Sequence, residues 1–192
     1  EMFALCIDRT TGKVLLDRKM YDIKNPGFCP SMNSFASPTP VIEEGRVYLH
    51  FGSYGTACLD TETFKVLWER RDLECNHYRG PGSSPIIFED LIICHYDGFD
   101  YQFVIALNKS TGETVWRTER PFNFGTDNGD MKKAFATPIV IDVNGRPQLI
   151  SPTSKGTFAY DARTGEEIWR VRYEGFSTAC RPLYEAGLLI IS

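Results

Sequence analysis

The sequence Ala159-Tyr-Asp-Ala-Arg-Thr-Gly-Glu-Glu-Ile-Trp169 is the fullest copy of a motif that occurs four times in this chain of 192 residues. The other copies read Cys6-Ile-Asp-Arg-Thr-Thr-Gly-Lys-Val-Leu-Leu16, Cys58-Leu-Asp-Thr-Glu-Thr-Phe-Lys-Val-Leu-Trp68 and Ala106-Leu-Asn-Lys-Ser-Thr-Gly-Glu-Thr-Val-Trp116. Their Asp or Asn residues lie 52, 48 and 53 residues apart, and a proline followed by two apolar residues keeps the same step at Pro40, Pro85, Pro138 and Pro182. Repeats of this length indicate a propeller or a solenoid.

Each repeat predicts four short strands. In the second repeat, residues 41–43 and 46–51 flank a turn at Glu44-Gly45, and residues 56–60 and 65–70 flank a turn at residues 61–64, the place of the Asp-x-x-Thr-Gly segment in the other copies. The Asp side chain accepts from backbone N–H groups two residues on, and Gly supplies a positive φ. A β-helix usually has shorter repeats, and helical repeats need a 3.6-residue period that is absent here. The pattern therefore predicts an all-β propeller of four-stranded antiparallel blades.

The tryptophan that closes the motif is expected to pack between neighbouring blades. A large flat side chain is well suited to the space where adjacent sheets meet. We therefore assign Trp68, Trp116 and Trp169 to structural blade contacts, with ligand stacking by one of them as the alternative.

The run Ala-x-Asp-x-x-Thr-Gly-x-x-x-Trp, nearly complete at 159–169, resembles the repeat of the PQQ-like (quinoprotein-type) β-propellers. That family includes quinoprotein dehydrogenases, the lipoprotein scaffold of bacterial outer-membrane protein assembly, and secreted proteins without assigned activity. The resemblance covers residues 1–192 as a single domain. Three residues depart from the motif: Leu16 stands in place of the tryptophan, Phe64 in place of the turn glycine, and Asn108 in place of the aspartate.

The strand count suggests an incomplete ring. The chain starts in the third strand of a blade and stops after a second strand, which gives three complete blades and two half blades. The resemblance implies a parent ring of seven or eight blades. The alternative is that the two half blades pair and close a small four-bladed ring, which would leave no open edge.

Composition excludes several classes of function. The formal net charge is −4, so the chain lacks the basic field that binds nucleic acid. No apolar run approaches the ~18 residues that span a bilayer, and the chain begins Glu1-Met2-Phe3-Ala4 without a signal peptide. The six cysteines show no zinc spacing and are expected to be mostly free, so no metal site is predicted.

The crossovers between blades are expected to share one face with the loops that join second and third strands, because successive strands alternate direction. From the end of each motif to the next marker proline the chain spans 24, 17, 22 and 13 residues, whereas the turns of the opposite face are short. Function on β scaffolds usually lies on such loops. The candidate ligand-binding residues are Asn33, His77, Tyr78, Arg79, Asp127, Asp130 and Arg181. The adjoining loops add Tyr54, Asp97, Asp100, Tyr101 and Lys155.

Each candidate also has a structural interpretation. His77, Tyr78 and Arg79 suit a carboxylate or sugar ligand, but polar loop residues of this kind also fasten crossovers to blades. The stretch from Asp127 to Asp130 lacks the 12-residue calcium pattern and is interpreted as a plain turn. Lys132 and Lys133 are interpreted as a solvated pair.

One polar position ends the second strand of every repeat, at His50, His95, Ser151 and Ser192. Stacked sheets lie ~10 Å apart, so these side chains are expected to be too distant to share a metal. We expect them to satisfy backbone groups of the loops beneath the crossover face.

Three functions are compatible with these patterns. The first is a non-catalytic scaffold that presents the loop-rich face to a protein or carbohydrate partner without a cofactor, and it is preferred because no catalytic constellation is evident. The second, implied by the resemblance, is a quinoprotein oxidoreductase with PQQ and calcium, whose ligand set is not located by motif. The third is a polysaccharide lyase or hydrolase that uses His77, Tyr78 and Arg79. The resemblance also implies a periplasmic or secreted location.

Overall fold

In the computed structural model, which describes residues 1–120 and 123–192, the chain consists mainly of strands and short turns. The strands of these ranges are β1 (Met2–Ile7), β2 (Val14–Tyr21), β3 (Val41–Glu43), β4 (Arg46–His50), β5 (Thr56–Asp60), β6 (Val66–Arg70), β7 (Ile86–Phe88), β8 (Leu91–Asp97), β9 (Gln102–Asn108), β10 (Thr114–Glu119), β11 (Ile139–Val143), β12 (Arg146–Thr153), β13 (Gly156–Asp161), β14 (Glu167–Arg172), β15 (Leu183–Glu185) and β16 (Leu188–Ile190). Two 3₁₀ turns, η1 (Gly52–Tyr54) and η2 (Gly129–Met131), lie in loops and were not expected.

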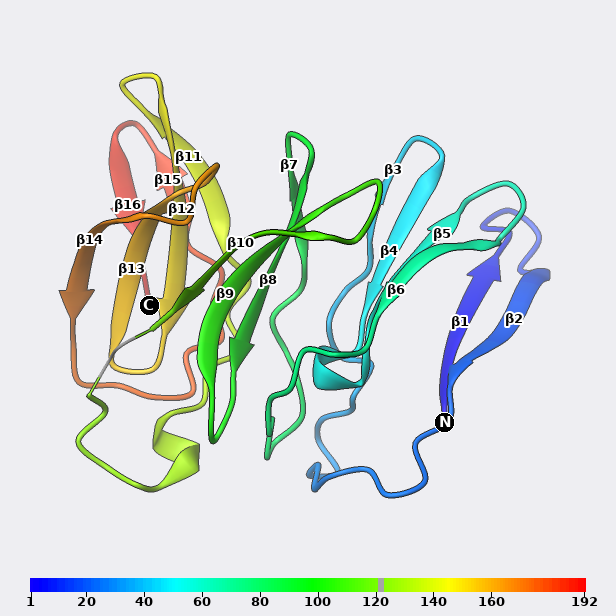
Figure 1. Ribbon diagram of the computed structural model, residues 1–192, viewed down its shortest axis with the longest axis horizontal. Coiled ribbons are helices and arrows are strands. Elements are labelled where there is room, and N and C mark those ends of the chain that lie inside the picture. Colours follow the sequence, from blue (N-terminus) through cyan, green and yellow to red (C-terminus); the bar gives the residue numbers. More distant parts are fainter. Residues whose placement is uncertain (121–122) are drawn as a thin grey trace.

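The strands form the predicted blades. Three four-stranded antiparallel sheets have the orders β3-β4-β5-β6, β7-β8-β9-β10 and β11-β12-β13-β14, and β1-β2 and β15-β16 are two-stranded sheets. The prediction of an all-β propeller with three complete and two half blades is confirmed. In Figure 1 the crossovers and the loops that join second to third strands lie on one side of the molecule, and the turns that join first to second and third to fourth strands lie on the other, so the expected division into two faces holds.

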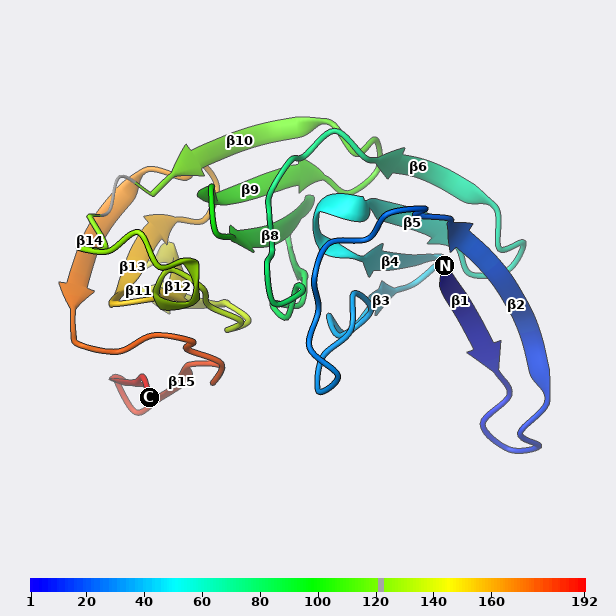
Figure 2. The same cartoon turned by 90° about the horizontal axis from the view of Figure 1, so that it is seen from below.

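The blades follow an open arc. Figure 2 shows the short first strands on the concave side and β2, β6, β10 and β14 on the convex side. The half blades β1-β2 and β15-β16 lie at opposite ends of this arc and form separate sheets. The alternative of a small four-bladed ring closed by their pairing is therefore wrong, because the angle between successive blades keeps the two ends far apart.

The motif turns share one geometry, including those that depart from the consensus. Asp8 Oδ1 accepts from the backbone N–H of Thr10 at 3.0 Å and of Thr11 at 2.7 Å, and Asn108 Oδ1 accepts equivalent bonds at 2.9 and 3.1 Å. Phe64 stands where the other turns have glycine and adopts φ 56°, in the left-handed region that disfavours L side chains. The fold thus imposes the turn where the residue type does not favour it.

The core lies between adjacent sheets. Tyr48, Cys58 and Trp68 of one blade pack with Ile92 and Tyr96 of the next. A second cluster joins the following pair of blades in the same way through Trp116, Leu149, Phe158 and Tyr160. Burial of apolar surface at these interfaces is the main force that holds the blades together.

Two of the motif tryptophans reach the next blade. Trp68 donates from Nε1 to the carbonyl of Lys109 at 2.9 Å, and Trp116 donates to the carbonyl of Ala162 at 3.3 Å. Trp169 instead bonds Gln148 Oε1 of its own blade at 3.0 Å and is half-buried. The Nε1 bond of Trp169 therefore stays within its own sheet.

Gly112 provides a direct test of this tryptophan contact. A Cβ at Gly112, whose φ is +75°, would lie 2.6 Å from the Trp68 ring, whereas a Cβ at Gly12, with φ +72°, has no atom within 4 Å. Both Gly→Ala changes strain the backbone by about 1 kcal/mol. We expect Gly112→Ala to lower the free energy of unfolding by about 1–2 kcal/mol more than Gly12→Ala, because only the former displaces Trp68. Urea unfolding curves measure both free energies. Equal losses for the two variants would contradict the role of Trp68 as a contact between blades.

The residues before the marker prolines form a relay between blades. The N–H of Thr39 donates to Ser84 Oγ at 2.8 Å, and the N–H of Ser84 donates to Thr137 Oγ1 at 3.0 Å. The equivalent position of the last half blade is Arg181, which has no hydroxyl group. The relay therefore extends from the first crossover to the third.

Candidate functional site

Arg79 and Asp130 are brought together on the crossover face. Arg79 belongs to the crossover before β7, and Asp130 lies in η2 of the crossover before β11. Nε and Nη2 of Arg79 donate to the two carboxylate oxygens of Asp130 at 2.6 and 2.5 Å. Such a two-point bond fixes both position and orientation, and it lowers the pKa of the Asp130 carboxyl group. The pair ties two crossovers together.

Asn33 joins the first crossover to the same pair. Its Nδ2 donates to the carbonyl of Arg79 at 2.7 Å and to that of Pro81 at 3.2 Å. On the other side of the pair, the N–H of Ser177 donates to the carbonyl of Lys133 at 3.0 Å. All four crossovers are therefore linked by hydrogen bonds.

Tyr78 lies in an aromatic cluster at this face. Its ring centroid is 5.8 Å from that of Phe28 and 5.6 Å from that of Phe99, and the Arg79 guanidinium lies 5.2 Å from it. Its backbone has φ 53°, an unfavourable conformation for a tyrosine. The first crossover and the loop between β8 and β9 thus hold Tyr78 in place.

His77 does not face solvent with its two neighbours. It is only 5% exposed, and its Nε2 accepts from the backbone N–H of Ser53 at 3.0 Å. Its Nδ1 lies 3.4 Å from Lys133 Nζ, and burial with this cation holds the pKa of His77 well below its ordinary value. His77 therefore lies beneath the loop surface, with its ring against Gly52 of η1, and its ligand-binding role stays a prediction.

Asp127 and Arg181 are not among the residues that bond to the Arg79–Asp130 pair. Asp127 is exposed in the turn that precedes η2. Arg181 is exposed and borders a cavity of about 530 Å³ between the first strands of two blades, near Ile86 and Ile139. Of the seven candidates, the structure groups Asn33, Tyr78, Arg79 and Asp130, with His77 beneath them.

A cavity of about 540 Å³ opens beside the Arg79–Asp130 pair. We call it the crossover pocket, and its lining comes from all four crossovers. The lining residues are Pro30, Met32, Asn33, Arg79, Gly82, Asp130, Phe135, Phe176 and Ser177. Met32 is 91% exposed and Phe176 is 55% exposed, so large apolar side chains stand at its rim. The pocket therefore combines a tied polar pair with an apolar surface.

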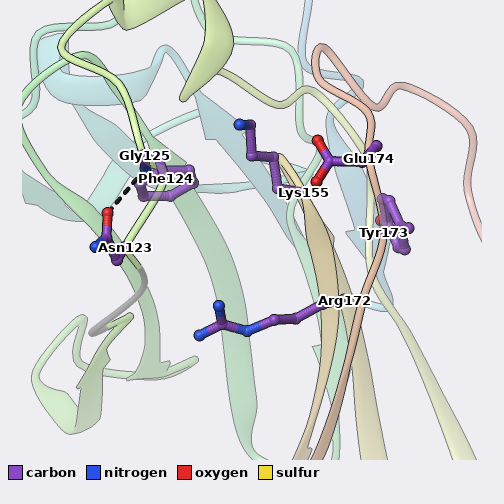
Figure 3. A pocket seen from close by; sticks show the side chains of 7 residues that line it. All are labelled: Asn123, Phe124, Gly125, Lys155, Arg172, Tyr173 and Glu174. Atoms are coloured by element: carbon purple, nitrogen blue, oxygen red, sulfur yellow. Dashed lines mark hydrogen bonds between the residues drawn. The ribbon is translucent and has the colours of Figure 1, made fainter.

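A second cavity of about 480 Å³ lies at the outer side of the third complete blade. Figure 3 shows Lys155, Tyr173 and Glu174 on one side and Asn123, Phe124 and Gly125 on the other, with the Arg172 side chain extending toward the latter. It combines two cationic side chains with one carboxylate and shares no lining residue with the crossover pocket.

A buried charged network lies beneath the crossover face. Arg120 donates from Nη1 to Asp97 Oδ1 and from Nη2 to Ser151 Oγ, and both charged side chains are almost completely buried. Thr153 Oγ1 donates to the same Asp97 oxygen at 2.8 Å. The network joins the end of β8, the end of β12 and the crossover that begins at Arg120.

Lys133 extends this network, contrary to the expectation of a solvated lysine. It is 2% exposed, and its Nζ donates to the carbonyl of Asp97 at 2.6 Å and lies 4.9 Å from the Phe135 ring. Burial lowers the pKa of the Lys133 ammonium group. The interpretation as a solvated pair is wrong for Lys133, because the crossover turns its side chain inward toward the end of β8.

Two of the polar residues that end the second strands lie closer together than expected. Ser151 Oγ lies 3.0 Å from His95 Nε2 of the neighbouring blade, so the prediction that these side chains are far apart is wrong for this pair. The blades converge at this level, near the concave side. His50 bonds Thr56 Oγ1 at 2.8 Å instead, through Nδ1.

The donor set of the described residues does not fit a calcium-dependent quinone site. Calcium requires six to eight oxygen ligands, and within residues 1–120 and 123–192 no three His, Cys, Asp or Glu side chains converge on one point. Oδ1 of the buried Asp97 carboxylate accepts from Arg120 and Thr153, whereas its Oδ2 is buried without a hydrogen-bond partner among the described residues.

Comparison with known proteins places these features in a family. The sequence profile of the family described as outer membrane protein assembly factor BamB matches residues 4–192. The quinoprotein ethanol dehydrogenase of Pseudomonas putida is 30% identical over 142 residues, which is 67% of this chain and 22% of that protein. Methanol dehydrogenase (cytochrome c) subunit 1 of Methylorubrum extorquens is 25% identical over 71% of this chain and 23% of its own length. The chain thus spans less than a quarter of these dehydrogenases.

Solved structures share the fold. BamB from Moraxella catarrhalis superimposes with a TM-score of 0.65 at 15% identity, over 93% of this chain and 49% of that one. A europium-containing methanol dehydrogenase gives a TM-score of 0.61 at 14% identity, over 90% of this chain and 38% of that one. In the part of the chain that the structure describes, no helix is long and apolar enough to cross a membrane.

Proposed function

The chain belongs to the PQQ-like repeat family whose profile bears the name of outer membrane protein assembly factor BamB, and from this membership we propose that it is a non-catalytic scaffold for a protein partner in the periplasm or outside the cell. The crossover face is the proposed contact surface. The observation that carries this proposal is the linkage of all four crossovers around the Arg79–Asp130 pair. A surface held in one conformation loses little entropy when a partner binds.

The geometry argues against catalysis by His77, Tyr78 and Arg79. A general base must reach the proton that it removes, but the His77 ring is buried and bonded to Ser53. The guanidinium of Arg79 already holds Asp130 through two bonds. These contacts favour the structural interpretation of the loop over a lyase or hydrolase.

Photo-crosslinking in the producing cells tests the scaffold function. A benzoylphenylalanine at position 32, on the crossover face, is expected to yield an adduct of defined mass with another protein. The same residue at position 62, an exposed site in the β5–β6 turn on the opposite face, is expected to yield none. Equal adducts from both positions, or none from position 32, would refute the proposal.

The similarity to quinoprotein ethanol dehydrogenase supports a second candidate, a quinone-dependent oxidoreductase. Ligands that bind only the folded state raise the melting temperature. The scaffold proposal expects PQQ with calcium to leave the melting temperature of the full chain unchanged. A saturable increase would favour the oxidoreductase instead.

A further inference from the structure

We propose that the crossover pocket binds an extended, uncharged segment of a protein partner by taking up one large apolar side chain. This inference rests on the proposed scaffold function and specifies the chemistry of its contact. The pocket is bordered by all four crossovers, so one inserted side chain would touch each of them.

The pocket is already formed in the free chain. Arg79 and Asp130 are joined through two bonds, and Asn33 fixes the carbonyl groups of Arg79 and Pro81. On the opposite wall, the N–H of Phe135 donates to the carbonyl of Thr178 at 2.7 Å. Phe135 also lies against Gly82, where a Cβ would come within 2.6 Å of its ring. A pocket with such walls needs little rearrangement to accept a ligand.

The apolar side chains at the rim determine what fits. Met32 and Phe176 stand on opposite crossovers and are mostly exposed, although they belong to loops that are otherwise tied down. Methionine adapts its shape to different partners, and aromatic rings provide large contact areas. Together with Phe135 and Pro30 they suit a phenylalanine, leucine or methionine side chain.

The charges of the pocket select an uncharged segment. Its two charged side chains neutralise each other, and each oxygen of Asp130 already accepts from Arg79. A charged group of the ligand would therefore lose its hydration in the pocket and would find no unpaired opposite charge there to compensate for the loss. Nε and Nη2 of Arg79 are taken up by Asp130, and its exposed Nη1 makes no bond to another described residue, so Nη1 would be free to donate to a backbone carbonyl of the segment.

Methionine-methyl NMR of the full chain tests the proposal, because the sequence has only four methionines. Titration with acetyl-Gly-Phe-Gly-amide is expected to shift the Met32 methyl signal saturably, with a dissociation constant of about 1–10 mM, while buried Met2 stays unchanged. Acetyl-Gly-Asp-Gly-amide and acetyl-Gly-Lys-Gly-amide are expected to bind at least about tenfold more weakly. Raising the salt concentration should not weaken the binding of the Phe peptide.

Two variants localise the binding. Phe176→Ser is expected to lower the affinity for the Phe peptide about tenfold, because it removes one apolar side chain from the rim of the pocket. Val115→Ser, at an equally exposed apolar site on β10, is expected to change nothing. Equal affinity for all three peptides, or no effect of Phe176→Ser, would overturn the proposal. A Met32 shift that depends on protein concentration alone would show a second copy of the chain in the pocket and would also overturn it.

The two proposals fail separately. Adducts from position 32 without peptide binding would support the scaffold function and refute the apolar pocket as the contact site. Peptide binding without adducts would support the pocket as a binding site and refute the scaffold function.

Discussion

Replacing Arg120 by methionine is expected to lower the free energy of unfolding by about 3–5 kcal/mol. The change keeps most of the apolar stem but leaves the carboxylate of Asp97 buried without its cation. The network also loses the bond from Arg120 to Ser151. Urea unfolding followed by tryptophan fluorescence measures the loss.

Two further variants show whether burial of the charge is responsible. Arg163→Met removes the partner of Glu89 in an exposed ion pair at 2.6 Å and is expected to leave the free energy of unfolding nearly unchanged. Asp97→Asn added to Arg120→Met is expected to recover part of the lost stability, because the unpaired charge is removed. Similar losses for Arg120→Met and Arg163→Met would contradict a special role for the buried pair.

Lowering the pH from 7.5 to 5 is expected to destabilise the chain through its three histidines. All three are buried, and burial lowers the pKa of His50 to about 4 and those of His77 and His95 well below the ordinary value. The unfolded chain therefore binds protons more readily than the folded one below about pH 6.5. The buried neutral histidines contribute their full stabilisation above about pH 6.5. This stabilisation is lost as the pH falls toward the pKa that the histidines have in the folded state.

The contribution of one histidine can be isolated. For His50 the pKa difference corresponds to about 2 kcal/mol of lost stability at pH 5 relative to pH 7.5. His50→Gln keeps a polar side chain and does not titrate, so its unfolding free energy should fall by about 2 kcal/mol less over this interval. Urea midpoints at four or five pH values provide the comparison. Parallel curves for the two proteins would show that His50 does not contribute to the pH dependence.

The fold could be predicted from the sequence because each blade repeats the same local chemistry. The Asp or Asn of each motif turn bonds its own backbone, so four copies predict four similar hairpins. The division into two faces followed from strand alternation alone. The curvature of the arc could not be predicted in this way, because it depends on the angle at which whole sheets pack.

The candidate site was only partly predictable. Arg79 and Asp130 were both singled out, but their pairing depends on how two crossovers 51 residues apart approach each other. Arg120 was missed because it looks like an ordinary loop cation in the sequence. The available signal was its position directly after β10, at the same face as Asp97 at the end of β8.

The hydroxyl relay at Thr39, Ser84 and Thr137 has a consequence for how the chain comes apart. In repeat proteins each unit is stabilised mainly by its neighbours. The relay has no hydroxyl at Arg181, and β15 and β16 are largely exposed. The last hairpin should therefore detach first, and its amide hydrogens should exchange with solvent by partial opening while those of β8 and β9 exchange only when the whole array unfolds.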